Sequence, residues 1–155
     1  MSYKKWAAII AAILLGLTFF VAGLGKLPAQ TEAYMIIFGL QRALLHPTLA
    51  NYIDTWLPRI EMVLGLLLMV GIAARSMSGF AGALTAAFIF NNSWEIVRGA
   101  GGDPCGCFGQ NSFLGYLSNT QALYIDIGML ALAVIVLLWY PRNWLSVRPW
   151  FIKSS

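Results

Sequence analysis

Four long apolar stretches divide this chain of 155 residues, and most of its polar positions lie between them. Each stretch is long enough to cross about 30 Å of hydrocarbon as an α-helix, which needs about 20 residues. A helix is expected because every backbone polar group in lipid needs a partner within its own segment. The stretches cover about residues 6–24, 57–74, 77–97 and 121–140. The pattern therefore predicts an all-α integral membrane four-helix bundle, with a single transmembrane domain over residues 1–155.

The connection between the first two spans, about residues 27–56, is not plain coil. It contains Thr31–Leu40, a mostly apolar segment that is too short to span and therefore predicts an interfacial helix. The part from Thr48 onward extends the second span as a helix, which Pro47 and Pro58 start or bend. We expect this connection to pack as a lid over one end of the bundle.

Small residues recur at helical spacing on two spans, where they would let neighbouring helices approach closely. These residues are Ala8, Ala12 and Gly16 on the first span and Gly79, Ala83 and Ala87 on the third. We expect both sets to form helix-packing seams, with a tight hairpin around Arg75 joining the second span to the third.

The composition supports lipid as the solvent. Charged residues make up 10% of the chain, against about a quarter in a soluble domain, and the mean hydropathy is +0.73. The net charge of +4 does not indicate a nucleic-acid partner, because the basic residues are scattered at the ends of apolar stretches. The expected surroundings are therefore membrane lipid.

The distribution of charge predicts the orientation. The first stretch follows Lys4 and Lys5 as a signal peptide would, but it exceeds the usual 7–15 apolar residues, so we expect a retained span. We expect the protein to lie in a bacterial-type inner membrane with both termini in the cytoplasm. In this topology the cytoplasmic segments carry no acidic residue. The basic residues then divide into Lys4, Lys5, Arg75, Arg142, Arg148 and Lys153 inside and Lys26, Arg42, Arg59 and Arg98 outside.

The second long connection, about residues 98–120, faces outward in this topology and contains the only two cysteines, Cys105 and Cys107. A disulfide between them would close a three-residue ring, for which loop entropy gives only about 1.6 kcal/mol. Strain in so small a ring favours a readily reduced bond, as in an exchange centre. A structural or inert pair is the alternative. A metal site is disfavoured, because two cysteines and the distant His46 do not complete a four-ligand set.

The sequence Cys105-Gly-Cys-Phe-Gly109, ahead of the last span, resembles the methylamine utilisation protein MauE family, within the DoxX-like four-helix membrane proteins. Ala22–Leu27 and Ile60-Glu61 resemble less specific patterns of that group. The resemblance implies thiol–disulfide exchange with an extracytoplasmic thioredoxin-like protein, with Cys105 and Cys107 as the catalytic pair. Some DoxX-like proteins are instead subunits of quinol-linked oxidases. The resemblance leaves a link to methylamine metabolism open.

Several charged residues are predicted to lie within or beside the spans, at one level of the bundle. Charges in lipid usually face the interior in pairs, so ion pairs that join the helices are one interpretation. The other is a proton or quinone head-group site, with quinone as the one cofactor to consider. The residues for that site are Glu61, Glu95, Asp126, Arg98 and Trp94, with Phe108 and Tyr124 as further lining.

Two functions follow from these patterns. The first is a membrane thiol–disulfide oxidoreductase that passes electrons between a thioredoxin-like partner and, in one version, a membrane quinone. The second is a non-enzymatic small subunit of a larger respiratory or photosynthetic membrane complex, in which the cysteine loop contacts a neighbour.

Overall fold

The computed structural model describes residues 3–27, 47–105, 108 and 116–140. Within these residues the chain forms α-helices and no strand, which confirms the all-α prediction. The helices are α1 (Tyr3–Lys26), α3 (Pro47–Val70), α4 (Ala74–Glu95) and α5 (Asn119–Trp139), and α4 continues into a short π-helical segment, η3 (Ile96–Ala100). The predicted interfacial helix at Thr31–Leu40 lies outside the described residues.

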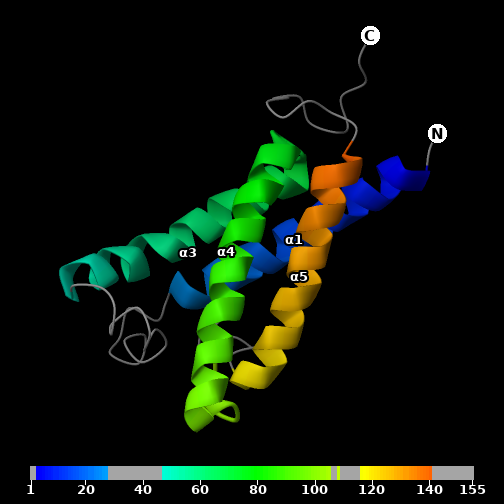
Figure 1. The fold of residues 1–155 in the computed structure, drawn as a ribbon. Coiled ribbons are helices and arrows are strands. Elements are labelled where there is room, and N and C mark those ends of the chain that lie inside the picture. The colour runs from blue at the N-terminus through cyan, green and yellow to red at the C-terminus, as the bar shows by residue number, and fades with distance from the viewer. Residues whose placement is uncertain (1–2, 28–46, 106–107, 109–115, 141–155) are drawn as a thin grey trace.

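The helices pack as two pairs that cross each other (Figure 1). Helix α1 lies along α3, and α4 lies along α5, while α1 also contacts α5. The start of α1, the turn between α3 and α4 and the end of α5 share one end of the molecule, where Ala8, Ala74 and Val136 form a buried cluster. The end of α4, η3 and the start of α5 lie at the opposite end, which also carries Cys105; we call it the cysteine end.

Glycine makes the contact between α1 and α3 possible. A Cβ atom added to Gly16 would lie 2.6 Å from the carbonyl oxygen of Gly65, and one added to Gly23 would lie 2.7 Å from that of Pro58. Real Cβ atoms do not come this close to backbone, so the two helices touch through bare main chain. Small residues serve the same purpose in membrane helix pairs.

The small-residue seam predicted on α1 is confirmed, since Ala8, Ala12 and Gly16 are all buried. The seam predicted on α4 is wrong, because Ala83 and Ala87 are exposed. The face of α4 that packs inward carries Ser78, Ala81 and Thr85. Gly82 borders that face, where an added Cβ would lie 3.6 Å from Cβ of Ala133 on α5. The predicted residues and those that pack inward both recur at helical spacing, so spacing alone did not show which face of α4 is packed.

Local signals in the sequence account for several helix ends. Pro47 begins α3, as predicted, and Pro58 lies inside it. The turn between α3 and α4 occupies residues 71–73, and Gly71 there has a φ of 80°. The hairpin predicted around Arg75 therefore lies slightly earlier in the chain, before α4 begins at Ala74. Arg75 lies in α4 instead, and its Nε donates to the carbonyl of Leu137 at 3.1 Å. Ser118 and Gln121 form a reciprocal capping box at the start of α5.

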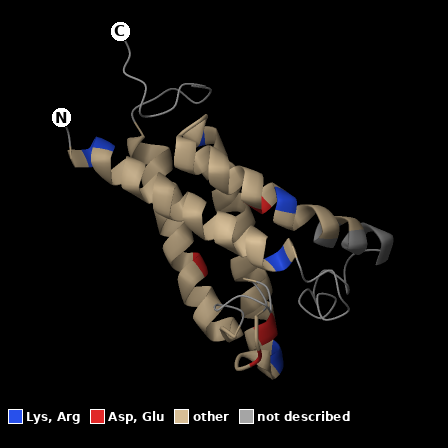
Figure 2. Cartoon of the chain, turned by 180° about the vertical axis from the view of Figure 1, so that it is seen from behind, with Lys and Arg blue, Asp and Glu red and all other residues tan. Residues whose placement is uncertain are grey.

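The core of the protein is mostly apolar, but it also holds polar side chains, and many large apolar side chains lie on the outside. Glu61, Thr85 and Asn92 are buried, whereas large apolar side chains point outward, with Val63 57% and Leu138 70% exposed. Most of the chain carries no charge, as Figure 2 shows. Within the described residues, α1 and α5 are long and apolar enough to cross a membrane. The other two predicted spans overlap α3 and α4, which are not among the helices that meet this test of length and hydropathy, so those two spans stay predictions.

Candidate functional site

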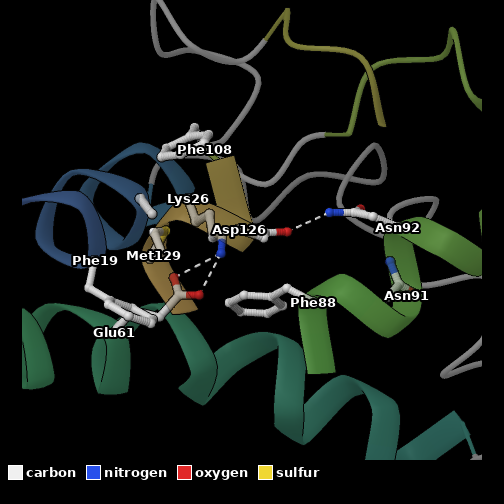
Figure 3. Close-up of a pocket in the computed structure, with 10 residues that line it drawn as sticks. Phe19, Lys26, Glu61, Phe88, Asn91, Asn92, Phe108, Asp126 and Met129 are labelled. Atoms are coloured by element: carbon white, nitrogen blue, oxygen red, sulfur yellow. Dashed lines mark hydrogen bonds and ion pairs between the residues drawn. The ribbon is translucent and has the colours of Figure 1, made fainter. Parts of the chain in front are cut away.

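A buried ion pair joins α1 to α3. Lys26, the last residue of α1, donates through Nζ to both carboxylate oxygens of Glu61, at 2.6 and 2.8 Å. The side chains are 3% and 0% exposed, so neither charge meets solvent. The ammonium also lies 5.1 Å from the ring centre of Phe88 on α4, a cation–π contact. One lysine thus connects three helices, as Figure 3 shows.

A second buried polar pair joins α4 to α5. The side-chain Nδ2 of Asn92 donates to Oδ2 of Asp126 at 2.8 Å. Asn92 is 1% and Asp126 5% exposed. A carboxylate this buried needs hydrogen-bond donors to offset its lost hydration, and the amide of Asn92 supplies one.

The two pairs border one small cavity (Figure 3). Its volume is about 20 Å³, which is room for about one water molecule. Asn91 lines it and is 9% exposed, and its Oδ1 has no hydrogen-bond partner among the described residues. The remaining lining residues are Phe19, Ala22, Lys26, Glu61, Phe88, Asn92, Phe108, Asp126 and Met129. A water bound here would satisfy the Asn91 oxygen.

The cysteine loop is tied to the start of α5 by backbone bonds. The amide of Cys105 donates to the carbonyl of Leu117 at 2.8 Å, and the amide of Asn119 donates to that of Asp103 at 3.0 Å. The side chain of Asn119 reaches back to the carbonyl of Ala100 at 2.7 Å. These bonds place Cys105 over the polar pair of α4 and α5.

Cys105 lies inside the protein rather than on its surface. The residue is 4% exposed, and its Sγ lies 3.4 Å from Oδ1 of Asn92. It is disulfide-bonded in this structure. Cys107 lies outside the described residues.

The structure brings together some of the charged and aromatic residues named from the sequence and leaves others apart. Glu61 and Asp126 line the cavity, and so does Phe108. Glu95, Arg98, Trp94 and Tyr124 do not line it: Arg98, Trp94 and Tyr124 are exposed, and Glu95 is half-buried with its Oε1 unpartnered among the described residues. The described residues contain no group of three potential metal ligands.

Sequence reasoning gave no role in the site to Asn91, Asn92 or Phe88, although all three line the cavity. The pair Asn91-Asn92 interrupts an otherwise apolar stretch, and that interruption is the signal that could have singled it out. The aromatic ring of Phe88 has no comparable signal, since it is one of nine phenylalanines in the chain.

These features define a helical membrane protein with a buried polar cluster beneath a cysteine-containing loop. The family model of the methylamine utilisation protein MauE matches residues 4–140, and the chain belongs to that family. No curated protein and no solved structure matches the chain. The membership confirms the resemblance drawn from the Cys-Gly-Cys-Phe-Gly sequence.

Proposed function

We propose that this MauE-family membrane protein performs thiol–disulfide exchange, with Cys105 and Cys107 as its redox pair. The observation that carries the proposal is the position of Cys105, disulfide-bonded and set against the buried Asn92–Asp126 pair. The chain contains only one other cysteine, Cys107, as its partner. A ring of three residues gains little loop entropy, so stability alone does not account for such a bond.

The exchange is balanced without a further cofactor. A partner dithiol becomes a disulfide, and the Cys105–Cys107 disulfide becomes two thiols, so two electrons and two protons pass from the partner to this chain. By the family resemblance, the partner is a thioredoxin-like protein on the extracytoplasmic side. The cavity of about 20 Å³ is far below the roughly 300 Å³ of a small ligand pocket, so the proposal does not include a quinone in it.

The reduction potential of the couple tests the proposal. The full-length protein in detergent is equilibrated in glutathione buffers, its free thiols are alkylated with a maleimide, and the two-adduct fraction is read by mass. An exchange centre should titrate above about −270 mV, whereas a structural disulfide lies below about −300 mV. A couple that stays oxidised below that limit would contradict the proposal.

Substitution of each cysteine provides the second test. Each of Cys105→Ser and Cys107→Ser should abolish the single-turnover oxidation of a thioredoxin-like dithiol, because a protein with one cysteine holds no internal disulfide to reduce. Gly128→Ala on α5, where an added Cβ meets nothing within 4 Å, keeps both cysteines and is the control. A stoichiometric complex with other membrane proteins that survives both cysteine substitutions would favour the role of a structural subunit instead.

A further inference from the structure

The environment of Cys105 suggests that the two cysteines have unequal roles. Its side chain is buried, with the residue 4% exposed, and its backbone is held by Leu117. A partner thiolate must approach the sulfur that it attacks along the axis of the disulfide bond. Burial of Cys105 therefore directs an incoming protein thiol away from this sulfur and toward the other one.

The side-chain amide of Asn92 faces Cys105 with its oxygen atom. An ionised carboxylate only accepts hydrogen bonds, so Asp126 requires the Nδ2 donor of Asn92, which lies 2.8 Å away. This bond leaves Oδ1 as the atom 3.4 Å from the Cys105 sulfur. Asp126 acts here as a positioning residue, because it selects which end of the amide the sulfur meets.

The Asn92 oxygen interacts differently with the thiol, thiolate and disulfide forms of Cys105. A thiol can donate its S–H to the Asn92 oxygen, whereas a disulfide sulfur has no hydrogen to donate. A thiolate would face the oxygen lone pairs and the Asp126 carboxylate without any donor from this pair. The arrangement thus favours Cys105 as a neutral thiol, which is its state after the disulfide has been reduced and protonated.

We propose that its burial makes Cys105 the inner, departing cysteine, that partner thiols attack Cys107, and that the Asn92–Asp126 pair stabilises Cys105 as the reduced thiol. This assignment rests on the proposed exchange function. A partner thiolate bonds to the Cys107 sulfur, and the Cys105–Cys107 bond breaks with its electron pair on Cys105. Cys105 then takes a proton and donates it in a hydrogen bond to Oδ1 of Asn92. The partner's second thiolate attacks its own sulfur in the mixed disulfide and releases Cys107.

Access, rather than the acidity of the departing thiol, decides the direction in this scheme. The rate of exchange depends on which sulfur is reachable as well as on thiol pKa values. The polar pair contributes mainly to the equilibrium, because it stabilises the reduced product. Two independent readouts follow: the reactivity of each cysteine and the potential of the pair.

The first readout uses single-cysteine proteins. Full-length Cys105→Ser and Cys107→Ser variants in detergent are treated with 5,5′-dithiobis(2-nitrobenzoate), and release of the coloured thiolate is followed. Cys107 should react at least about tenfold faster than Cys105, since access controls the rate. Equal rates, or a faster Cys105, would overturn the assignment.

The second readout is the reduction potential of variants that keep both cysteines. Asn92→Leu removes the acceptor, and the disulfide should become harder to reduce by about three- to tenfold in the exchange equilibrium with glutathione, the upper value being about 30 mV. Asp126→Asn should shift it in the same direction, because the Asn92 amide is then free to turn. Thr85→Val, which removes a buried hydroxyl from the same helix outside the cavity, is the matched control and should leave the potential unchanged.

The outcomes separate the two proposals. A disulfide that never titrates in any variant refutes the exchange function itself. A pair that titrates, but with the same potential in the wild type and in folded Asn92→Leu and Asp126→Asn proteins, refutes only the role of the polar pair. Helical circular dichroism and gel filtration establish that each variant is folded before its potential is compared.

Discussion

The ion pair between Lys26 and Glu61 allows a sharp test of how the helices are held together. Its two hydrogen bonds are short, at 2.6 and 2.8 Å, and both side chains are removed from solvent. Lys26→Met leaves the Glu61 carboxylate buried without its counter-ion, and Glu61→Met leaves the ammonium in the same condition. Breaking a buried pair from one side costs about 3–5 kcal/mol.

The double variant decides whether this cost comes from the pair or from each side chain separately. Replacing both partners of a buried ion pair by apolar residues is often close to neutral. The variant with both Lys26→Met and Glu61→Met should therefore unfold within about 2 kcal/mol of the wild type, far from the sum of the single losses. Arg59→Met is the control, because Arg59 is exposed and its contacts should contribute less than about 1 kcal/mol.

The measurement is reversible unfolding in mixed detergent micelles, followed by helical circular dichroism and by tryptophan fluorescence. Coincident transitions from the two probes justify comparing free energies of unfolding. Single losses that add up in the double variant to within about 0.5 kcal/mol would show that the two residues are not coupled. The reasoning from the buried geometry would then be wrong.

Further predictions concern the helix contacts and ends, and the same unfolding assay checks them. Gly65→Ala should destabilise by about 1–3 kcal/mol, because the new Cβ would lie 2.5 Å from the carbonyl oxygen of Gly16. Gly128→Ala on α5 meets nothing within 4 Å and should instead stabilise by up to about 1 kcal/mol through helix propensity; a loss there, or none at Gly65, would contradict the packing argument. Ser118→Ala removes the cap of α5 and should cost about 0.5–2 kcal/mol, with an unchanged stability counting against the capping box.

Family membership and burial pattern agree on a membrane protein, and each supports the other. A buried carboxylate, amide and hydroxyl beside outward-facing valine and leucine would be a poor arrangement in water, because exposed apolar surface is unfavourable there. In lipid the same arrangement is expected, since polar groups turn inward to find partners. In lipid, the polar groups at the cysteine end must therefore find their hydrogen-bond partners within the protein.

The positions of the helices could be predicted from the sequence alone, because a helix is specified locally. Apolar stretches of about 20 residues mark all four helices, and Pro47 and the Ser118–Gln121 box mark two of their beginnings. The unusual spacing of Cys105 and Cys107 singled out the candidate chemistry in the same way. These signals lie within a few residues of each other and need no knowledge of tertiary contacts.

Only the tertiary structure decided which polar groups meet. Glu61 pairs with Lys26, 35 positions away, and Asp126 pairs with Asn92 rather than with a charged residue. Glu95 was as plausible a member of the site by its predicted depth, yet it does not line the cavity. Depth along a helix follows from residue count, whereas the direction of a side chain depends on the rotation of its helix against its neighbours. Packing sets that rotation, through contacts such as the bare approach of Gly16 to Gly65.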